Sequence, residues 1–308
     1  AAEVAVVQPD IPEDLKLRSA RAADSARTAS EALLRRPEID GADPDLVVLP
    51  ETVFPLLIDS IPSAGYAGRP AIRRWVGRTA RRLDAALLYG GMGSDDLGEG
   101  EFDYYNSAFL VDPEGERTSR YDKRNLVPVV ERVPFVNPDW FRMVNYFGGY
   151  GVGERTGAMT AAGASFGVLI CYESIFADRS RRYRREGAEF VVNMTNDAWF
   201  GRHEPRWSRT SALWQHPAHL IMRAVENRMG VVRSANTGIS GLVDPLGRFH
   251  RRTGLFREAA FAGTVYTSDQ VTVFTEWGDW VGTGSALLAL LGAAAVGWGR
   301  ADGDDRAS

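Results

Sequence analysis

Short apolar runs alternate with longer stretches rich in arginine, alanine and leucine along most of this 308-residue chain. The runs have the length of buried strands, and the stretches carry arginine on one face and apolar residues on the other, as solvent-facing helices do. This alternation predicts an α/β fold in which helices cover the sheets. The predicted strands are Val4–Val7, Leu46–Leu49, Ala86–Tyr89, Ala108–Val111, Phe166–Ile170, Phe190–Met194, Val231–Ser234 and Gly263–Tyr266. The predicted helices are Glu13–Arg36, Pro70–Leu83, Ser174–Glu186 and Arg209–Asn227.

The composition limits the class of protein further. With 44% hydrophobic and 25% charged residues, the chain has the profile of a globular protein with a sizeable core. A net charge of −4 argues against a nucleic-acid binder, which carries a basic excess. Cys171 is the single cysteine, so the chain forms no internal disulfide and no CxxC metal site. Cys171 is therefore either an inert residue that fills space in the core or a reactive thiol.

A long uncharged segment, 281–298, lies near the C-terminus between tryptophans at 277, 280 and 298. As a helix it would extend roughly 27 Å, close to the thickness of a bilayer's hydrocarbon core. Basic residues follow it and none lie just before it, which predicts a cytoplasmic C-terminus and an extracytoplasmic main domain. The alternative is a buried hairpin or core helix. We predict a catalytic domain at 1–276, a transmembrane helix at 277–299 and a polar tail at 300–308.

Two charged residues follow predicted strands. Glu51 comes directly after Leu46–Leu49 and Pro50, at the carboxyl edge where open α/β sheets build their sites. Lys123 stands among arginines in a chain whose only other lysine is Lys16. A lysine suits a developing oxyanion because it is a compact point charge, whereas arginine presents a wide fork. The alternatives are a solvated turn carboxylate and an ordinary surface charge.

Cys171 follows a third strand, Phe166–Ile170, and a helix is predicted to start at Ser174. Such a turn exposes the thiol near backbone amides and a helix N-terminus, which favour the thiolate. A lone cysteine after an apolar strand can also be buried and inert. A nucleophile, a carboxylate base and an ammonium at three strand ends are, however, the parts that acyl transfer through a thioester needs.

These residues lie in motifs that resemble the nitrilase superfamily. The motifs are LPET at 49–52, YDKRNLVP at 121–128 and CYES at 171–174. More narrowly, the chain resembles the nitrilase-like domain of the apolipoprotein N-acyltransferase family, through KRNLVPVVERVPF (123–135), NMTNDAWFG (193–201), MRAVENR (222–228), RSANTGISG (233–241) and WGDW (277–280). The resemblance implies a four-layer αββα nitrilase-like sandwich followed by one C-terminal hydrophobic helix. The family also carries a bundle of transmembrane helices before this domain, a part that the present sequence does not include.

The resemblance implies a role for each matching residue. Glu51 would be the general base, Lys123 the oxyanion stabiliser and Cys171 the nucleophile. Three residues would support them: Glu131, Tyr172 and Glu173. The implied reaction needs no cofactor and no metal.

The resemblance also implies the substrates. An sn-1 acyl chain would pass from a phospholipid to the N-terminal α-amino group of an S-diacylglyceryl-cysteine apolipoprotein, on the periplasmic side of the bacterial inner membrane. One alternative is a soluble carbon–nitrogen hydrolase that acts on a small amide. Another is a scaffold without activity, against which the intact Glu51, Lys123 and Cys171 argue.

Aromatic residues mark two candidate substrate-binding segments. One lies within 135–147, where the dense aromatic residues are typical of an arm that enters the membrane interface. The alternative is an internal helix that packs its aromatics into the core. The other follows Asn196 and Asp197, where the alternative is ordinary loop packing. The candidate residues are Trp140, Phe141, Tyr146, Trp199 and Phe200.

Two further patterns carry less weight. Ser165 lies in a G-x-S-x-G match at 163–167, but it precedes a predicted strand, whereas a nucleophilic serine follows one. His216 and His219 lack a third ligand, and we interpret them as a polar helix start.

Overall fold

Two β-sheets lie face to face in the computed structural model of the chain, which describes residues 1–12, 19–57, 69–99, 101–128, 130–131, 149–154 and 157–305. The first sheet has the strand order β13 (Ala259–Val265), β1 (Ala2–Gln8), β2 (Leu46–Val48), β4 (Ala86–Gly98), β5 (Glu101–Val111) and β6 (Arg117–Asp122), and β3 (Phe54–Leu57) pairs with β4. The second has the order β12 (Phe249–His250), β11 (Gly241–Val243), β10 (Gly230–Ala235), β9 (Phe190–Thr195), β8 (Ala164–Ile170) and β7 (Met159–Ala161).

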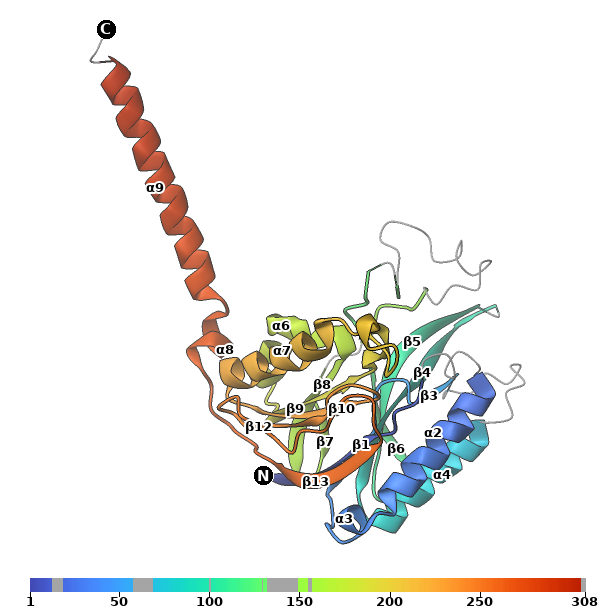
Figure 1. Cartoon of the computed structure of the whole chain (residues 1–308). Coiled ribbons are helices and arrows are strands. Elements are labelled where there is room, and N and C mark those ends of the chain that lie inside the picture. The colour runs from blue at the N-terminus through green and yellow to red at the C-terminus, as the bar shows by residue number, and fades with distance from the viewer. Residues whose placement is uncertain are drawn as a thin grey trace.

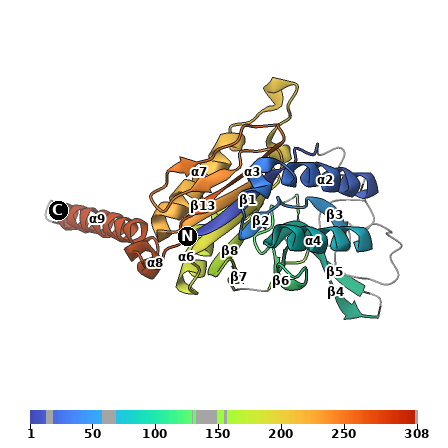
Figure 2. The ribbon, with the colours of Figure 1, turned by 90° about the horizontal axis from the view of Figure 1, so that it is seen from below.

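Helices cover the outer faces of both sheets (Figure 1). Helices α2 (Ser19–Leu34) and α4 (Arg69–Leu83) lie side by side on the first sheet, as Figure 2 also shows, and the short α3 (Pro37–Asp40) follows α2. Helices α6 (Ala177–Arg185) and α7 (Ala212–Asn227) cover the second sheet, and the short α8 (Val273–Trp277) contacts both of them. The predicted order of helix, sheet, sheet and helix is confirmed.

The core has two parts because each strand presents alternate residues to opposite faces. In β1, Val4 and Val6 face the second sheet, while Ala5 and Val7 face α2 and α4. All four side chains are fully buried. The inner strands are therefore apolar on both sides, which explains why the sequence shows them as unbroken apolar runs.

Parallel pairing brings several strand ends to one region. Strands β1, β2 and β4 pair in parallel in the first sheet, as β8, β9 and β10 do in the second. The carboxyl ends of parallel strands meet at one edge of a sheet. The segments that follow β2, β8 and β9, which contain Glu51, Cys171 and Asn196, start from such edges.

All eight predicted strands are present, with ends that differ by a few residues or, for β4 and β5, by more. The sequence analysis missed β3, β6, β7, β11 and β12, because these are short or, like Arg117–Asp122, largely polar. The helix predicted from Ser174 begins only at Ala177. A 3₁₀ turn, η1 (Cys171–Ile175), comes first, since the Glu173 side chain folds back to accept a hydrogen bond from the Ile170 amide.

Helix α9 (Trp280–Asp305) leaves the body and extends away from it (Figures 1 and 2). It includes the predicted helix at 281–298 and continues to Asp305, through most of the predicted tail. Leu287, Leu288, Leu290 and Leu291 are 57–72% exposed, so the alternative of a buried core helix is wrong. Among the described residues, however, no helix combines the length and the apolar character that crossing a bilayer requires.

Candidate active site

Glu51 is buried between the ends of the two sheets. Its Oε1 accepts a hydrogen bond from Asn106 Nδ2 at 2.7 Å, and its Oε2 accepts one from the Asn196 backbone amide at 2.8 Å. The ammonium of Lys123 lies 3.4 Å from Oε1. The alternative of a solvated turn carboxylate is therefore wrong, and the carboxylate is held from both sheets.

Lys123 follows β6 and is only 1% exposed. Its Nζ lies 2.8 Å from Glu131 Oε1 and 3.4 Å from Glu51 Oε1. Burial alone lowers the pKa of Lys123, but the charges of Glu51, Cys171 and Glu131 together raise it well above its usual value. The side chain is therefore an ammonium held among acidic groups, and the alternative of an ordinary surface charge is wrong.

Glu131 completes the surroundings of this ammonium. Its Oε1 accepts hydrogen bonds from Lys123 Nζ and, at 3.2 Å, from Asn106 Nδ2. Its Oε2 accepts one from the Val127 amide at 2.8 Å, which ties the segment after Lys123 to the same carboxylate. Glu131 thus contacts the lysine, as the resemblance implies.

Replacing Glu131 by glutamine is expected to lower kcat while leaving KM nearly unchanged. The amide keeps the shape but loses the charge that holds Lys123, so the loss should stay below the about 10²–10³-fold of removing an oxyanion donor outright. Steady-state kinetics of the variant measure it. Glu116→Gln is the matched control because Glu116 is an exposed acidic residue. An unchanged kcat in Glu131→Gln would contradict a role in holding the lysine.

Cys171 begins η1 directly after β8 and is buried. Its φ is +49°, in the left-handed region that costs a non-glycine residue on the order of 1–3 kcal/mol. Burial, and then the charge of Glu51, raise the pKa of the Cys171 thiol well above its usual value, although the charge of Lys123 and the neighbouring Thr195 hydroxyl lower it. The expectation that the turn favours the thiolate is therefore wrong for the resting site, because burial and the carboxylate outweigh the cation.

Glu173 connects the turn at Cys171 to the segment after Lys123. It is fully buried, and its Oε2 accepts a hydrogen bond from the Ile170 amide at 2.8 Å. Its Oε1 accepts from three donors: the amides of Arg124 (2.8 Å) and Asn125 (3.1 Å) and the hydroxyl of Tyr121 (2.8 Å). Burial raises the pKa of Glu173, and the backbone hydrogen bonds oppose that rise. The side chain thus fixes two segments that are far apart in the sequence.

The aromatic candidates differ in what the structure shows of them. The Tyr172 ring packs edge-on against Phe176, with centroids 5.1 Å apart. Trp199 is 53% exposed in η2 (Asp197–Phe200), and Phe200 packs edge-on against His216. The other three candidates lie outside the described residues: Trp140, Phe141 and Tyr146. Substrate binding by the five candidates, and the supporting role of Tyr172, stay predictions.

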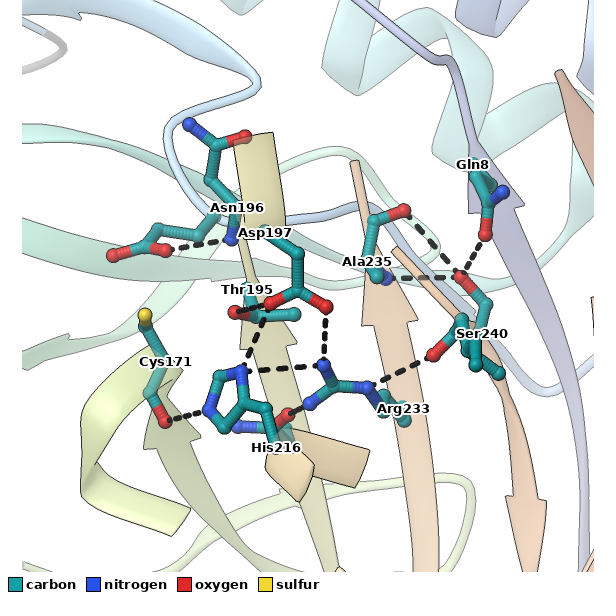
Figure 3. Close-up of polar contacts among 12 residues, drawn as sticks. Gln8, Cys171, Thr195, Asn196, Asp197, His216, Arg233, Ala235 and Ser240 are labelled. Carbon is teal, nitrogen blue, oxygen red and sulfur yellow. Dashed lines mark hydrogen bonds and ion pairs between the residues drawn. The ribbon is translucent and has the colours of Figure 1, made fainter. Parts of the chain in front are cut away.

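Three polar residues that the sequence analysis did not single out together lie behind Cys171: Asp197, His216 and Arg233 (Figure 3). His216 is buried, so its interpretation as part of a polar helix start is wrong. Arg233 is fully buried in β10. An arginine inside the apolar strand Val231–Ser234 was the available signal, since a buried charge needs a partner.

The two weaker patterns give no second site. Ser165 lies inside β8, not at a strand end, which agrees with setting it aside. Within the described parts of the chain, no group of three or more histidine, cysteine, aspartate or glutamate side chains is placed to hold a metal ion.

Comparison with known proteins identifies the family. The sequence profile described as "Carbon-nitrogen hydrolase" matches residues 3–269. The chain belongs to the carbon–nitrogen hydrolase family. Solved structures agree with the fold of this chain. An amidase from Nesterenkonia sp. AN1, captured after Michael addition of acrylamide at its active-site cysteine, superposes with a TM-score of 0.56 at 21% identity, over 86% of this chain and 93% of the amidase.

Curated relatives of this chain share a narrower name. "Apolipoprotein N-acyltransferase" from Geobacter metallireducens is 34% identical over 295 residues, which cover 94% of this chain and 53% of that protein. The protein of the same name from Brucella melitensis is 33% identical over 310 residues, covering 96% and 53%. The resemblance seen in the motifs is confirmed, and the chain spans about half the length of these relatives.

Proposed function

We propose that this chain is the catalytic domain of an N-acyltransferase that completes bacterial lipoprotein maturation. It would move an sn-1 acyl chain from a phospholipid, through a thioester on Cys171, to the α-amino group of an S-diacylglyceryl-cysteine apolipoprotein. The observation that carries this proposal is the similarity to enzymes named apolipoprotein N-acyltransferase across 94–96% of the chain. The burial of Glu51, Lys123 and Cys171 together supports it.

In the first half-reaction Glu51 takes the proton of the Cys171 thiol, and the thiolate attacks the ester carbonyl carbon. A base is needed because the raised pKa of Cys171 keeps the resting thiol protonated. The ammonium of Lys123, with the Tyr172 backbone amide, stabilises the tetrahedral oxyanion. The carbon–oxygen bond then breaks, the lysophospholipid alkoxide takes the proton back from Glu51, and an acyl thioester remains on Cys171.

In the second half-reaction the α-amino group of the acceptor attacks the thioester carbonyl. Glu51 takes a proton from the attacking nitrogen, and Lys123 again stabilises the oxyanion. The carbon–sulfur bond breaks, the Cys171 sulfur leaves as the thiolate and receives the proton from Glu51, and the acceptor carries a new amide. This order predicts ping-pong kinetics, because lysophospholipid leaves before the acceptor reacts.

We place this activity at the bacterial inner membrane, because both substrates of the proposed reaction carry acyl chains that reside in a bilayer. We place it on the extracytoplasmic side because of the charges beside the uncharged segment. The exposed leucines of α9 support contact between this helix and lipid. Arg300, which follows the uncharged segment, supports a cytoplasmic C-terminus and therefore an extracytoplasmic main domain.

Intact-mass measurement of the chain in detergent with a phosphatidylethanolamine of defined acyl chains tests the proposal. We expect one added acyl mass that neutral hydroxylamine removes, because a thioester reacts with it and an amide does not. Cys171→Ala is the control and should gain no mass. A hydroxylamine-resistant adduct, or an equal adduct on Cys171→Ala, would overturn the thioester.

A second candidate is hydrolysis of a small amide, with water as the second nucleophile. The shared fold with the Nesterenkonia amidase, which extends over 86% of this chain, favours it. The same sample, offered acetamide or propionamide, separates the two candidates. Ammonia release that depends on Cys171, without any lipid-derived adduct, would replace the acyltransferase proposal by this one.

A further inference from the structure

The backbone at Cys171 is held from two sides. Its φ of +49° is unfavourable for a residue with a side chain and persists only where the surroundings fix it. On one side Glu173 holds the amide of Ile170, the residue before the nucleophile. On the other side the carbonyl oxygen of Cys171 lies 3.0 Å from Nε2 of His216, on α7 (Figure 3).

The direction of this hydrogen bond follows from its partners. A backbone carbonyl oxygen only accepts, so Nε2 of His216 carries a hydrogen and donates it to Cys171. The ring is buried, and the edge of Phe200 packs against it at 5.7 Å between centroids. The donor therefore has little freedom to turn away from the carbonyl.

Asp197 and Arg233 fix the other side of the ring. Asp197 Oδ1 lies 2.9 Å from His216 Nδ1, and Asp197 Oδ2 accepts a hydrogen bond from Arg233 Nη2 at 2.6 Å. Burial alone raises the pKa of Asp197, but the charge of Arg233 and then the interaction with His216 lower it below its usual range. Arg233 Nε also donates to the Ile239 carbonyl at 2.9 Å, so the guanidinium is itself fixed.

The segment that holds the histidine also holds the base. Asn196, next to Asp197, donates its backbone N–H to Glu51 Oε2 at 2.8 Å. Thr195 donates to Asp197 Oδ1 at 3.0 Å, so its hydroxyl holds the same carboxylate. The end of β9 therefore fixes the base directly and the nucleophile through His216.

We propose that His216 is a positioning residue that holds the strained backbone of Cys171 by donating Nε2–H to its carbonyl, and that Asp197 and Arg233 orient the ring for this task. His216 acts through the nucleophile's backbone and does not touch substrate. The inference rests on the proposed role of Cys171 as nucleophile. It concerns the geometry of the thiol, so it can be tested without any acyl substrate.

Two variants that differ by one methylene provide the test. The two variants are His216→Gln and His216→Asn, and both new side chains are polar and smaller than histidine. In His216→Gln the amide N–H reaches the position of Nε2, whereas in His216→Asn the side chain is too short to reach it. In His216→Asn we expect the turn to relax and the thiol to move away from Glu51. The pH midpoint of alkylation by iodoacetamide should then fall toward about 8.5, the value of an ordinary thiol. Thioester formation should fall by up to about 10²-fold, as for a 1 Å misplacement.

His216→Gln should keep the alkylation midpoint near that of the wild type and thioester formation within a few-fold of it. Alkylation is read as one mass increment, because Cys171 is the only cysteine. His219→Asn, on the same helix, is the matched control and should change neither quantity. All measurements are made below the melting temperature of each variant, so that global unfolding does not contribute.

Equal alkylation midpoints in wild type, His216→Gln and His216→Asn would overturn the inference, whatever the substrate proves to be. Equal shifts in His216→Gln and His216→Asn would show that the ring's shape matters and its donated hydrogen does not, which also overturns it. A lowered alkylation midpoint in His216→Asn alone, as predicted, combined with no acyl adduct on the wild type or any variant, would instead count against the proposed function alone.

Discussion

Replacing Cys171 by alanine is expected to abolish the covalent acyl-enzyme and to lower turnover by at least about 10⁴-fold, the scale of losing a nucleophile in a hydrolytic triad. The chain has no second cysteine to take over the attack. The change removes only one sulfur atom from a buried turn, so the fold should be retained. Intact mass and product formation, measured with the same phospholipid, follow the two effects.

Ser165→Ala is the matched control, because Ser165 lies in the G-x-S-x-G pattern and on β8, the strand that directly precedes Cys171. This variant should keep the acyl adduct and the turnover of the wild type. Loss of the adduct in Ser165→Ala with retention in Cys171→Ala would assign the nucleophile to the serine and contradict the proposed mechanism.

Replacing Lys123 by arginine is expected to lower kcat by about 10²–10³-fold, although the positive charge is kept. The ammonium lies 2.8 Å from Glu131 and 3.4 Å from Glu51, with almost no exposed surface. A planar guanidinium is wider, so it must displace one of these carboxylates or turn its charge away from the oxyanion. Single-turnover formation of the thioester measures the step in which the lysine acts.

Arg117→Lys is the reciprocal control: Arg117 is exposed on β6, the strand that directly precedes Lys123, and the change should leave the rate unchanged. The melting temperature of Lys123→Arg separates a misplaced charge from a loss of folding. A rate for Lys123→Arg within a few-fold of the wild type, in a folded protein, would remove the lysine's compact charge from the mechanism.

The three proposed catalytic residues could be located from the sequence because each has a local signal. Glu51 and Cys171 follow apolar strands, and Lys123 is a lysine in a chain that uses arginine almost everywhere else. The strands themselves were predictable because both of their faces are buried, which gives unbroken apolar runs. The supporting role of Glu131 came only from the family resemblance, since its contacts with Lys123 and Asn106 depend on how separate segments meet.

The residues behind the nucleophile had no such local signal. His216 contacts Cys171, 45 positions away, and Asp197, 19 positions away. Helix periodicity does not predict contacts of this kind, and the isolated His216–His219 pair was interpreted as a polar helix start. Arg233 was detectable as a charge inside a strand, but its partner Asp197 belongs to the segment after β9, and only the parallel pairing of β9 with β10 brings the two together.

Among the described residues, the supports of the proposed reacting groups come from a strand, from segments that follow strands and from one helix packed on the sheet. Asn106 and Asn196 hold Glu51, Glu131 holds Lys123, and Glu173 and His216 hold the backbone on either side of Cys171. For protein engineering, the residues that hold the proposed catalytic groups are thus separate from the loops that would select the substrate. We therefore expect that loops around the site can be exchanged between members of the family to select the second nucleophile, water or amine, while these buried supports are kept.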